Sequence, residues 1–176
     1  RKYLSTFYVF VIGYFLISGQ FSITAGTEIS GELKQWHRVT LTFDGPETSE
    51  YDQNNPFLNY RLNVRFTRGE NVFVVPGFFA ADGHAAETST CKGNKWRVHF
   101  TPDQTGEWQY AVSVSKGKNL AIKDLSESGS PVVPNGETGS FIIKPTDKSG
   151  KDFRAKGKLR YVEKRYLQFA GTGDCF

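Results

Sequence analysis

The sequence lacks most of the residue patterns on which catalytic and metal-binding proteins depend. It contains no Met, two Cys and three His. No Cys-x-x-Cys pair occurs, and the histidines (His37, His84 and His99) are scattered, so no spacing typical of a zinc site is present. Gly-x-Ser-x-Gly turns and glycine-rich phosphate loops are absent as well. We therefore predict no catalytic residue, no cofactor site and no metal site.

The charges lack any pattern typical of nucleic-acid binding. The formal net charge is +4, and Arg1 and Lys2 supply two of the positive charges. The remaining charges of both signs are interspersed, and no basic run is long enough to form a stripe. We expect an ordinary charged surface and no nucleic-acid partner.

Long apolar runs are absent apart from one near the start, Phe7–Ile17 (FYVFVIGYFLI). It follows a basic pair and is about half of the ~20 residues that a membrane-spanning helix needs. A small and polar segment comes next. This pattern predicts a signal peptide over residues 1–25, with cleavage after Gly19, Ser22 or Ala25, and hence secretion to the periplasm or the cell exterior. An uncleaved anchor is the alternative; after cleavage we expect no membrane association.

Cysteine usage does not settle the redox chemistry. Cys91 and Cys175 are compatible with one disulfide in an oxidising compartment, but nothing in the sequence brings them together. The ends of the chain are more informative. Position 1 is not Met, and the last stretch, Tyr166–Phe176, is an apolar strand-like run of the kind that needs a partner. We interpret the chain as the N-terminal fragment of a longer protein.

Aromatic residues and turn formers are plentiful. Aromatic residues make up 15% of the chain, which also has 18 Gly and 7 Pro. Period-two alternation of apolar residues recurs, whereas helical periodicity does not. The apolar run at 72–75 fits a strand covered on both faces, and Leu120 with Ile122 fits a short edge strand. The clearest alternating strands lie at residues 39–43, 60–66, 96–100, 108–114 and 141–143.

About seven short strands separated by turn signals predict an all-β, immunoglobulin-like β-sandwich over residues 26–145, with a jelly roll as the alternative. After Pro145 the composition becomes charged and glycine-containing, and apolar alternation resumes at Leu159. We interpret residues 146–176 as a linker and the first strands of a further, truncated module.

Carboxylates are the first candidates for catalytic residues, because a glycosidase needs two of them across a cleft. Asp82, Glu87, Asp103 and Glu107 lie in expected loops or turns, where solvated turn residues are the simpler interpretation. Asp82 and Glu87 together with His84 could also bind a metal ion, although two carboxylates and one imidazole in a loop are a weak indication.

The three tryptophans are candidates for stacking on sugar rings. Trp96 and Trp108 are in phase with the inward apolar residues of their strands, which favours core packing for both. Trp36 precedes a strand instead and is the one more open to solvent, so it is the candidate carbohydrate contact.

Several longer segments carry a resemblance to a known family. They are ELKQWHRVTLTFDGP (32–46), NPFLNYRLNVRF (55–66), VPGFFAADGHAAET (75–88), GNKWRVHFTPDQTGEWQY (93–110) and DKSGKDFRAKGKLRYVEKRYLQF (147–169). From residue 32 to 176 the chain resembles the domain of unknown function numbered 5060, an N-terminal immunoglobulin-like module of secreted bacterial proteins. Cys175 departs from the aromatic residue expected at its position, which argues against a disulfide common to the family.

The resemblance implies a (β/α)8 barrel downstream that is similar to a glycoside hydrolase and would hold the catalytic carboxylates. The expected role of this chain is then a non-catalytic accessory domain of a secreted polysaccharide-degrading enzyme, with the barrel as its partner. A carbohydrate-binding module, with polysaccharide as its partner, and a protein-interaction or adhesion sandwich are the alternatives.

Overall fold

Strands dominate the computed structural model, which describes residues 26–163 and 165–176. The signal peptide predicted for residues 1–25 lies outside the described residues. Within the described part of the chain, no helix is long and apolar enough to cross a membrane. The helical segments there are single turns: α1 (Pro56–Asn59), α2 (Ala85–Thr88), α3 (Phe153–Lys156) and the 3₁₀ turn η1 (Leu120–Ile122).

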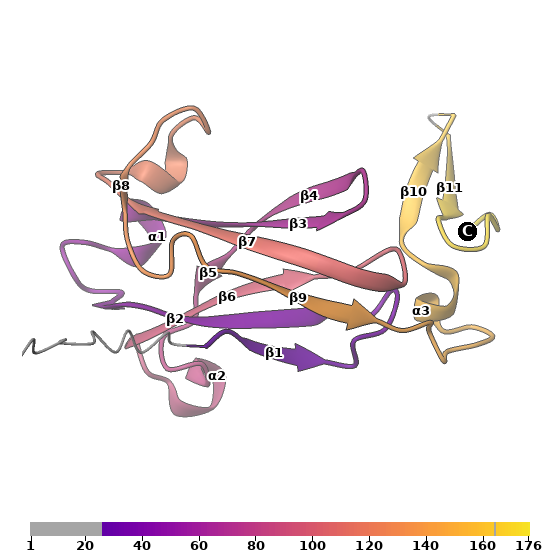
Figure 1. The fold of residues 1–176 in the computed structure, drawn as a ribbon, viewed down its shortest axis with the longest axis horizontal. Coiled ribbons are helices and arrows are strands. Elements are labelled where there is room, and N and C mark those ends of the chain that lie inside the picture. Colours follow the sequence, from indigo (N-terminus) through magenta and orange to yellow (C-terminus); the bar gives the residue numbers. More distant parts are fainter. Residues whose placement is uncertain (1–25, 164) are drawn as a thin grey trace, which may run out of the picture.

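Two antiparallel sheets form the body of the molecule (Figure 1). The first has the strand order β1-β2-β6-β5 and consists of β1 (Glu28–Gly31), β2 (Val39–Ser49), β6 (Lys92–Phe100) and β5 (Phe78–Phe79). The second has the order β4-β3-β7, with β8 and β9 both paired to β7; its strands are β3 (Tyr60–Arg68), β4 (Asn71–Pro76), β7 (Gly106–Lys116), β8 (Ser130–Pro131) and β9 (Thr138–Ile143). The expectation of an all-β chain is confirmed.

An aromatic core joins the two sheets. Phe66 of β3 stacks on Phe100 of β6 with ring centroids 4.1 Å apart, and Phe100 also meets Trp108 of β7 edge to face at 5.0 Å. Every alternating strand predicted from the sequence turns its apolar residues into this layer, because successive side chains of a strand point to opposite faces. Trp96 and Trp108 are 2% and 0% exposed, which confirms that they are core residues.

The prediction that the run at 72–75 is covered on both faces is wrong. These residues belong to β4, which pairs with β3 and forms an edge of the second sheet. Val72 and Val74 are therefore exposed, while Phe73 and Val75 pack against the core. A continuous apolar run does not distinguish a central strand from an edge strand whose outer valines stay in solvent.

The edge strand predicted at Leu120 and Ile122 is also wrong, because these residues form η1. Asn119 adopts a left-handed backbone conformation (φ 56°) that turns the chain, so Leu120 is buried and Ile122 is exposed. The guanidinium group of Arg61 on β3 then donates hydrogen bonds to carbonyl oxygens of this loop, among them those of Lys123 (2.6 Å) and Glu127 (3.0 Å). These carbonyl oxygens thus bond to Arg61 and not to a neighbouring strand.

Replacing Arg61 with Lys is expected to loosen the loop, because a single ammonium group cannot reproduce the forked set of donors. Hydrogen bonds to charged groups contribute about 1.5–3 kcal/mol each, and losing one accelerates amide exchange roughly tenfold. Hydrogen exchange of the amides at 120–127 measures this, with the β3 amides as an internal control. Unchanged exchange at 120–127 would show that Arg61 does not hold the loop.

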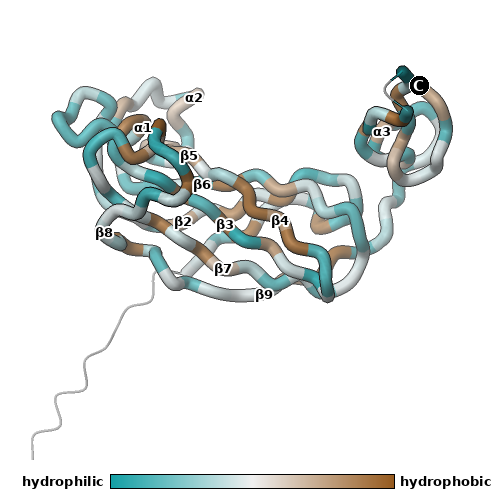
Figure 2. The backbone as a smooth tube through the Cα atoms, turned by 90° about the horizontal axis from the view of Figure 1, so that it is seen from above, coloured by the Kyte–Doolittle hydropathy of each residue, from teal (hydrophilic) through white to brown (hydrophobic). Residues whose placement is uncertain are grey.

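The C-terminal unit, residues 153–176 with α3, β10 (Leu159–Val162) and β11 (Tyr166–Phe169), lies at one end of the body, opposite α1 and β8 (Figures 1 and 2). β10 and β11 pair with each other as an antiparallel hairpin, so the strands expected after residue 158 are present. Phe153, Phe169 and Phe176 cluster with ring centroids 5.3–6.0 Å apart. This unit therefore has a small aromatic cluster of its own.

Candidate functional site

The four carboxylates considered at the sequence level lie in different surroundings: Glu87 lines a cavity beside α2, and one oxygen of Asp103 is buried without a hydrogen-bond partner. Asp82 accepts hydrogen bonds from the backbone N–H of His84 (2.7 Å) and from the hydroxyl of Thr88 (2.8 Å). The first of these contacts, with help from the second, lowers the pKa of Asp82 below its usual range. This carboxylate therefore caps the turn that leads into α2. Glu107 lies on β7 and is exposed.

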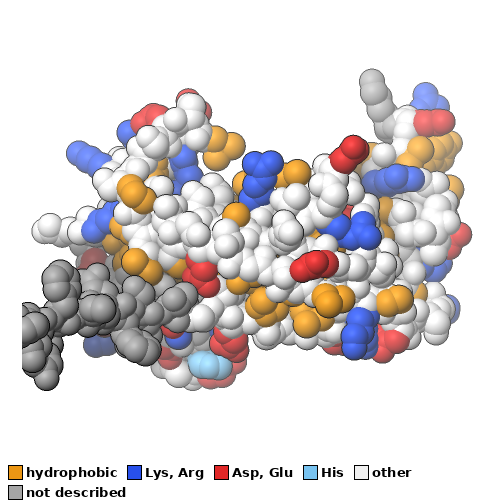
Figure 3. Space-filling view, in the orientation of Figure 1, with side chains coloured by type: hydrophobic (Ala, Val, Ile, Leu, Met, Phe, Trp, Pro, Cys, Tyr) orange, Lys and Arg blue, Asp and Glu red, His pale blue; other side chains and the backbone are white. Residues whose placement is uncertain are grey.

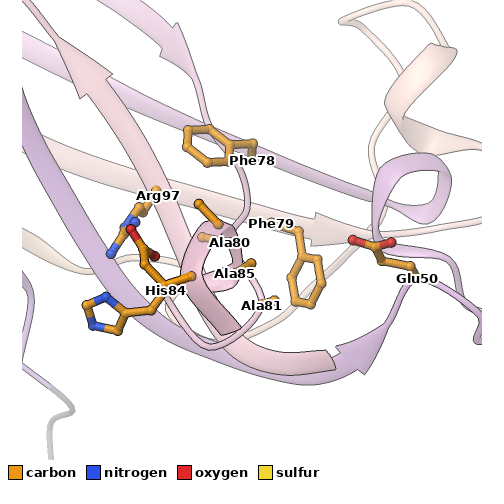
Figure 4. Close-up of a pocket in the computed structure, with 11 residues that line it drawn as sticks. Glu50, Phe78, Phe79, Ala80, Ala81, His84, Ala85 and Arg97 are labelled. Carbon is orange, nitrogen blue, oxygen red and sulfur yellow. The ribbon is translucent and has the colours of Figure 1, made fainter. Parts of the chain in front are cut away.

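A cavity of about 420 Å³ opens beside β5 and α2 (Figure 4). Phe78 and Phe79 of β5 form one part of its lining, and Arg97 of β6 and Glu50 contribute charge. In Figure 4 the His84 ring points away from Phe79 and Glu50. Phe78 is 40% exposed, and its ring lies 5.2 Å from that of His99. A half-exposed ring beside a cation and carboxylates is a surface on which a sugar could stack.

The candidate carbohydrate contact, Trp36, lies where the body meets the C-terminal unit. Its backbone N–H donates to the carbonyl of Pro102 (2.9 Å), and the side chain is half-buried. The indole lies directly against glycine backbone: a Cβ on Gly157 would stand 2.9 Å from Cε2, and one on Gly171 would stand 3.1 Å from Nε1. Trp36 also lines a cavity of about 270 Å³ with Phe153. Part of its surface is thus used in packing.

A cluster of charged groups lies on the same side of the junction. Its acidic members come from the β1–β2 connection and from the segment after β9, which run side by side because Lys34 and Lys144 form a parallel bridge. The Lys34 ammonium stands 3.0 Å from Glu32 and 2.7 Å from Asp147. This contact lowers the pKa of Glu32 and lowers that of Asp147 to about 2. These ion pairs link the β1–β2 connection to the segment that leads into the C-terminal unit.

Asp152 at the start of α3 provides a pH-dependent contact. Its carboxylate accepts from the backbone N–H (2.9 Å), Nε (3.0 Å) and Nη2 (2.7 Å) of Arg154, and the side-chain contact is the main reason that its pKa falls from 3.8 to about 2. A depressed carboxyl pKa stabilises the folded chain above the unfolded value. We therefore expect the stabilisation to be complete above about pH 4 and lost as pH falls toward 2.

A carbon-13 NMR titration of the Asp152 carboxyl group measures this midpoint directly. We expect it near pH 2 in the unaltered protein, and Arg154→Gln should move it back toward 3.8 because the bidentate donor is gone. A midpoint close to 3.8 in the unaltered protein would show that the Arg154 contact does not persist in solution.

The sequence did not point to the charged cluster. Glu32, Lys34 and His37 are close in sequence, but their charges resemble any solvated loop. Asp147 is more than a hundred positions away, and only the return of the chain along β9 brings it beside Lys34. The one available indication was the density of charge after Pro145, which we interpreted as a linker.

Comparisons with known proteins agree with the fold and with the resemblance noted in the sequence. Residues 32–115 match the model of a domain of unknown function, DUF5060. The chain carries a DUF5060 domain. The stretch after residue 115, including the segment at 147–169, lies outside that match. No match was found among curated proteins.

A solved structure extends the comparison beyond the DUF5060 domain. It is the crystal structure of a protein described as "a putative glycoside hydrolase" from Bacteroides vulgatus, with a TM-score of 0.52 and 25% sequence identity. The match covers 81% of this chain and 20% of the Bacteroides vulgatus chain. The present chain thus spans about a fifth of the length of that protein.

Proposed function

We propose that this chain is a non-catalytic accessory domain of a secreted polysaccharide-degrading enzyme. The observation that carries the proposal is the coverage of the structural match: 81% of this chain aligns with only 20% of a protein described as "a putative glycoside hydrolase". The DUF5060 match supports the same assignment. The site chemistry is consistent with it, since Asp82 caps a turn, Glu32 and Asp147 pair with Lys34, and Glu107 faces solvent.

The proposal divides the chain into three parts. Residues 1–25 are a signal peptide, residues 26–145 an immunoglobulin-like sandwich, and residues 146–176 a linker that leads into a (β/α)8 barrel with the catalytic carboxylates. Because the strands of such a barrel are parallel, the antiparallel β10–β11 hairpin corrects the expectation that residues 159–176 are its first strands, and it precedes the barrel instead. The two packed sheets support the second assignment. Support for the third is the exposure of Tyr161 and Tyr166 on the β10–β11 hairpin, since such side chains favour burial against a partner. Figure 3 shows hydrophobic side chains at this end of the molecule as well as along the body.

Expression of residues 26–176 tests the proposal, because this stretch contains the entire core described above. The purified domain is incubated with a panel of plant and algal polysaccharides, and newly formed reducing ends are measured. We expect none to form. Turnover of any polysaccharide by this domain alone would contradict a non-catalytic role.

Carbohydrate binding by the domain itself is the second candidate, and the exposed ring of Phe78 beside Arg97 favours it. Affinity electrophoresis in gels that contain each polysaccharide distinguishes two sites. Loss of retardation in Phe78→Ala points to the cavity beside β5, and loss in Trp36→Ala points to the junction. Unchanged mobility of the unaltered domain on every glycan would exclude this function for the polysaccharides used.

A further inference from the structure

One buried histidine in the charged cluster is not explained by packing or by the accessory role. His37 is 3% exposed, and its Nδ1 lies 2.9 Å from the carbonyl oxygen of Gln35. A carbonyl only accepts, so Nδ1 carries a proton and donates it. The other ring nitrogen, Nε2, is buried and has no hydrogen-bond partner. Leaving such a group unpaired costs free energy, so this position favours a partner for Nε2.

The unpaired nitrogen faces two carboxylates. Nε2 lies 3.7 Å from Oε2 of Glu32 and 3.9 Å from Oδ1 of Asp147. One potential ligand atom from each of these three side chains lies within 4.8 Å of the other two. Among residues 26–163 and 165–176, Glu32, His37 and Asp147 are the three side chains close enough together to hold a metal ion. Asp82, His84 and Glu87, the metal group considered from the sequence, do not form such a group.

We propose that Glu32, His37 and Asp147 bind a divalent transition-metal ion, with Zn²⁺ as the best fit. Imidazole nitrogen and carboxylate oxygen are ligands that zinc accepts at ~2.0–2.2 Å, and four-coordinate zinc takes three protein ligands with one position left for water. Bonds of that length place neighbouring ligand atoms roughly 3.4 Å apart, so the 3.7 and 3.9 Å separations need only a small closure. The Gln35 carbonyl fixes the required tautomer, as carbonyls and carboxylates do behind metal-binding histidines.

Nearby cationic side chains compete with the metal ion for the two carboxylates. Lys34 bridges both carboxylates at 3.0 and 2.7 Å, and Lys148 lies 3.6 and 3.3 Å from the same two groups. Arg154 stands 3.6 Å from the other Glu32 oxygen. A metal ion therefore has to displace the Lys34 ammonium, which already neutralises this pair. Lys34 and the metal ion therefore compete for the same two carboxylates. The bound ion would link the β1–β2 connection to the segment that follows β9.

Calorimetric titration of the metal-free protein with ZnCl₂ tests the proposal, together with NMR of the histidine rings. We expect one Zn²⁺ per chain and a change in the Nε2 resonance of His37. Asp147→Asn, whose side chain is 53% exposed and so leaves the core intact, should weaken binding at least tenfold. Lys34→Gln should strengthen it, because the competing cation is gone. His37→Gln should abolish it, provided that the variant still folds.

Two matched variants separate ligation from general attraction of cations. Asp152→Asn removes the same charge from a carboxylate that shares Arg154 with Glu32 but is no proposed ligand, and should leave the affinity within about twofold. His99→Gln removes an exposed histidine elsewhere and should also have no effect. The proposal is overturned if Asp147→Asn binds like the unaltered protein, if the His84 or His99 resonances respond instead of His37, or if neither the unaltered protein nor Lys34→Gln binds at millimolar Zn²⁺.

Discussion

Replacing Trp108 with Ala should lower the free energy of unfolding by about 3–5 kcal/mol, the largest effect expected from any single change discussed for this chain. The side chain is fully buried, its ring meets Phe100 at 5.0 Å and Phe73 at 5.9 Å, and its Nε1–H donates to the carbonyl of Gln104 at 2.9 Å. Alanine leaves a cavity between the sheets and an unpaired carbonyl. Because domains of this size are stable by ~5–15 kcal/mol, much of the stability would be lost.

Chemical denaturation followed by circular dichroism measures the loss. Val74→Ala is the matched control, since this valine lies on the outer face of β4 and is 62% exposed. It should change the free energy of unfolding by no more than about 0.5 kcal/mol. A loss below about 1 kcal/mol in Trp108→Ala would contradict the placement of this ring in the core.

Gly157→Ala is expected to have the second-largest effect, and to act on the junction between the body and the C-terminal unit. The residue has φ 90°, which already disfavours a side chain, and a Cβ there would stand 2.8 Å from the Gly171 nitrogen and 2.9 Å from the Trp36 ring. The strained backbone alone costs about 1–3 kcal/mol. The steric conflict adds to it and should push the C-terminal unit off Trp36.

Gly150→Ala is the control for the steric conflict. Gly150 also has a positive φ, 64°, but a Cβ there would meet nothing within 4 Å. It should show the backbone cost without displacement of the unit. Tryptophan fluorescence reports the difference, because exposure of Trp36 shifts the emission to longer wavelength in Gly157→Ala and not in Gly150→Ala. Equal spectra for the two variants would show that Gly157 does not pack on Trp36.

Period-two alternation was the dependable part of the sequence. It placed the strands around Phe43, Phe66, Phe100 and Trp108 correctly, because half-buried strands must alternate to bury one face. It failed where alternation carries no information. The valines of β4 look the same on an edge as in a sheet centre, and η1 owes its shape to Asn119 and to a distant arginine, Arg61.

The candidate sites were harder to predict because they depend on contacts distant in sequence. Trp36 was correctly expected to be more open than the other tryptophans, but nothing near it in the sequence indicates that Gly157 and Gly171 pack on its ring. The Glu32–His37–Asp147 group likewise depends on a single return of the chain. A sequence pattern indicates a set of metal ligands only when the ligands share one loop or strand. The three residues of this group do not share one.

Whether this domain serves a larger enzyme is tested most directly by hydrogen exchange of the C-terminal unit in two proteins. One is residues 26–176 alone, and the other is the product of the complete reading frame. We expect amides of β10, β11 and the segment around Phe176 to exchange markedly more slowly in the longer product, because a catalytic partner would cover the exposed aromatic side chains there. Identical exchange in the two proteins would contradict the proposal that the domain packs against such a partner.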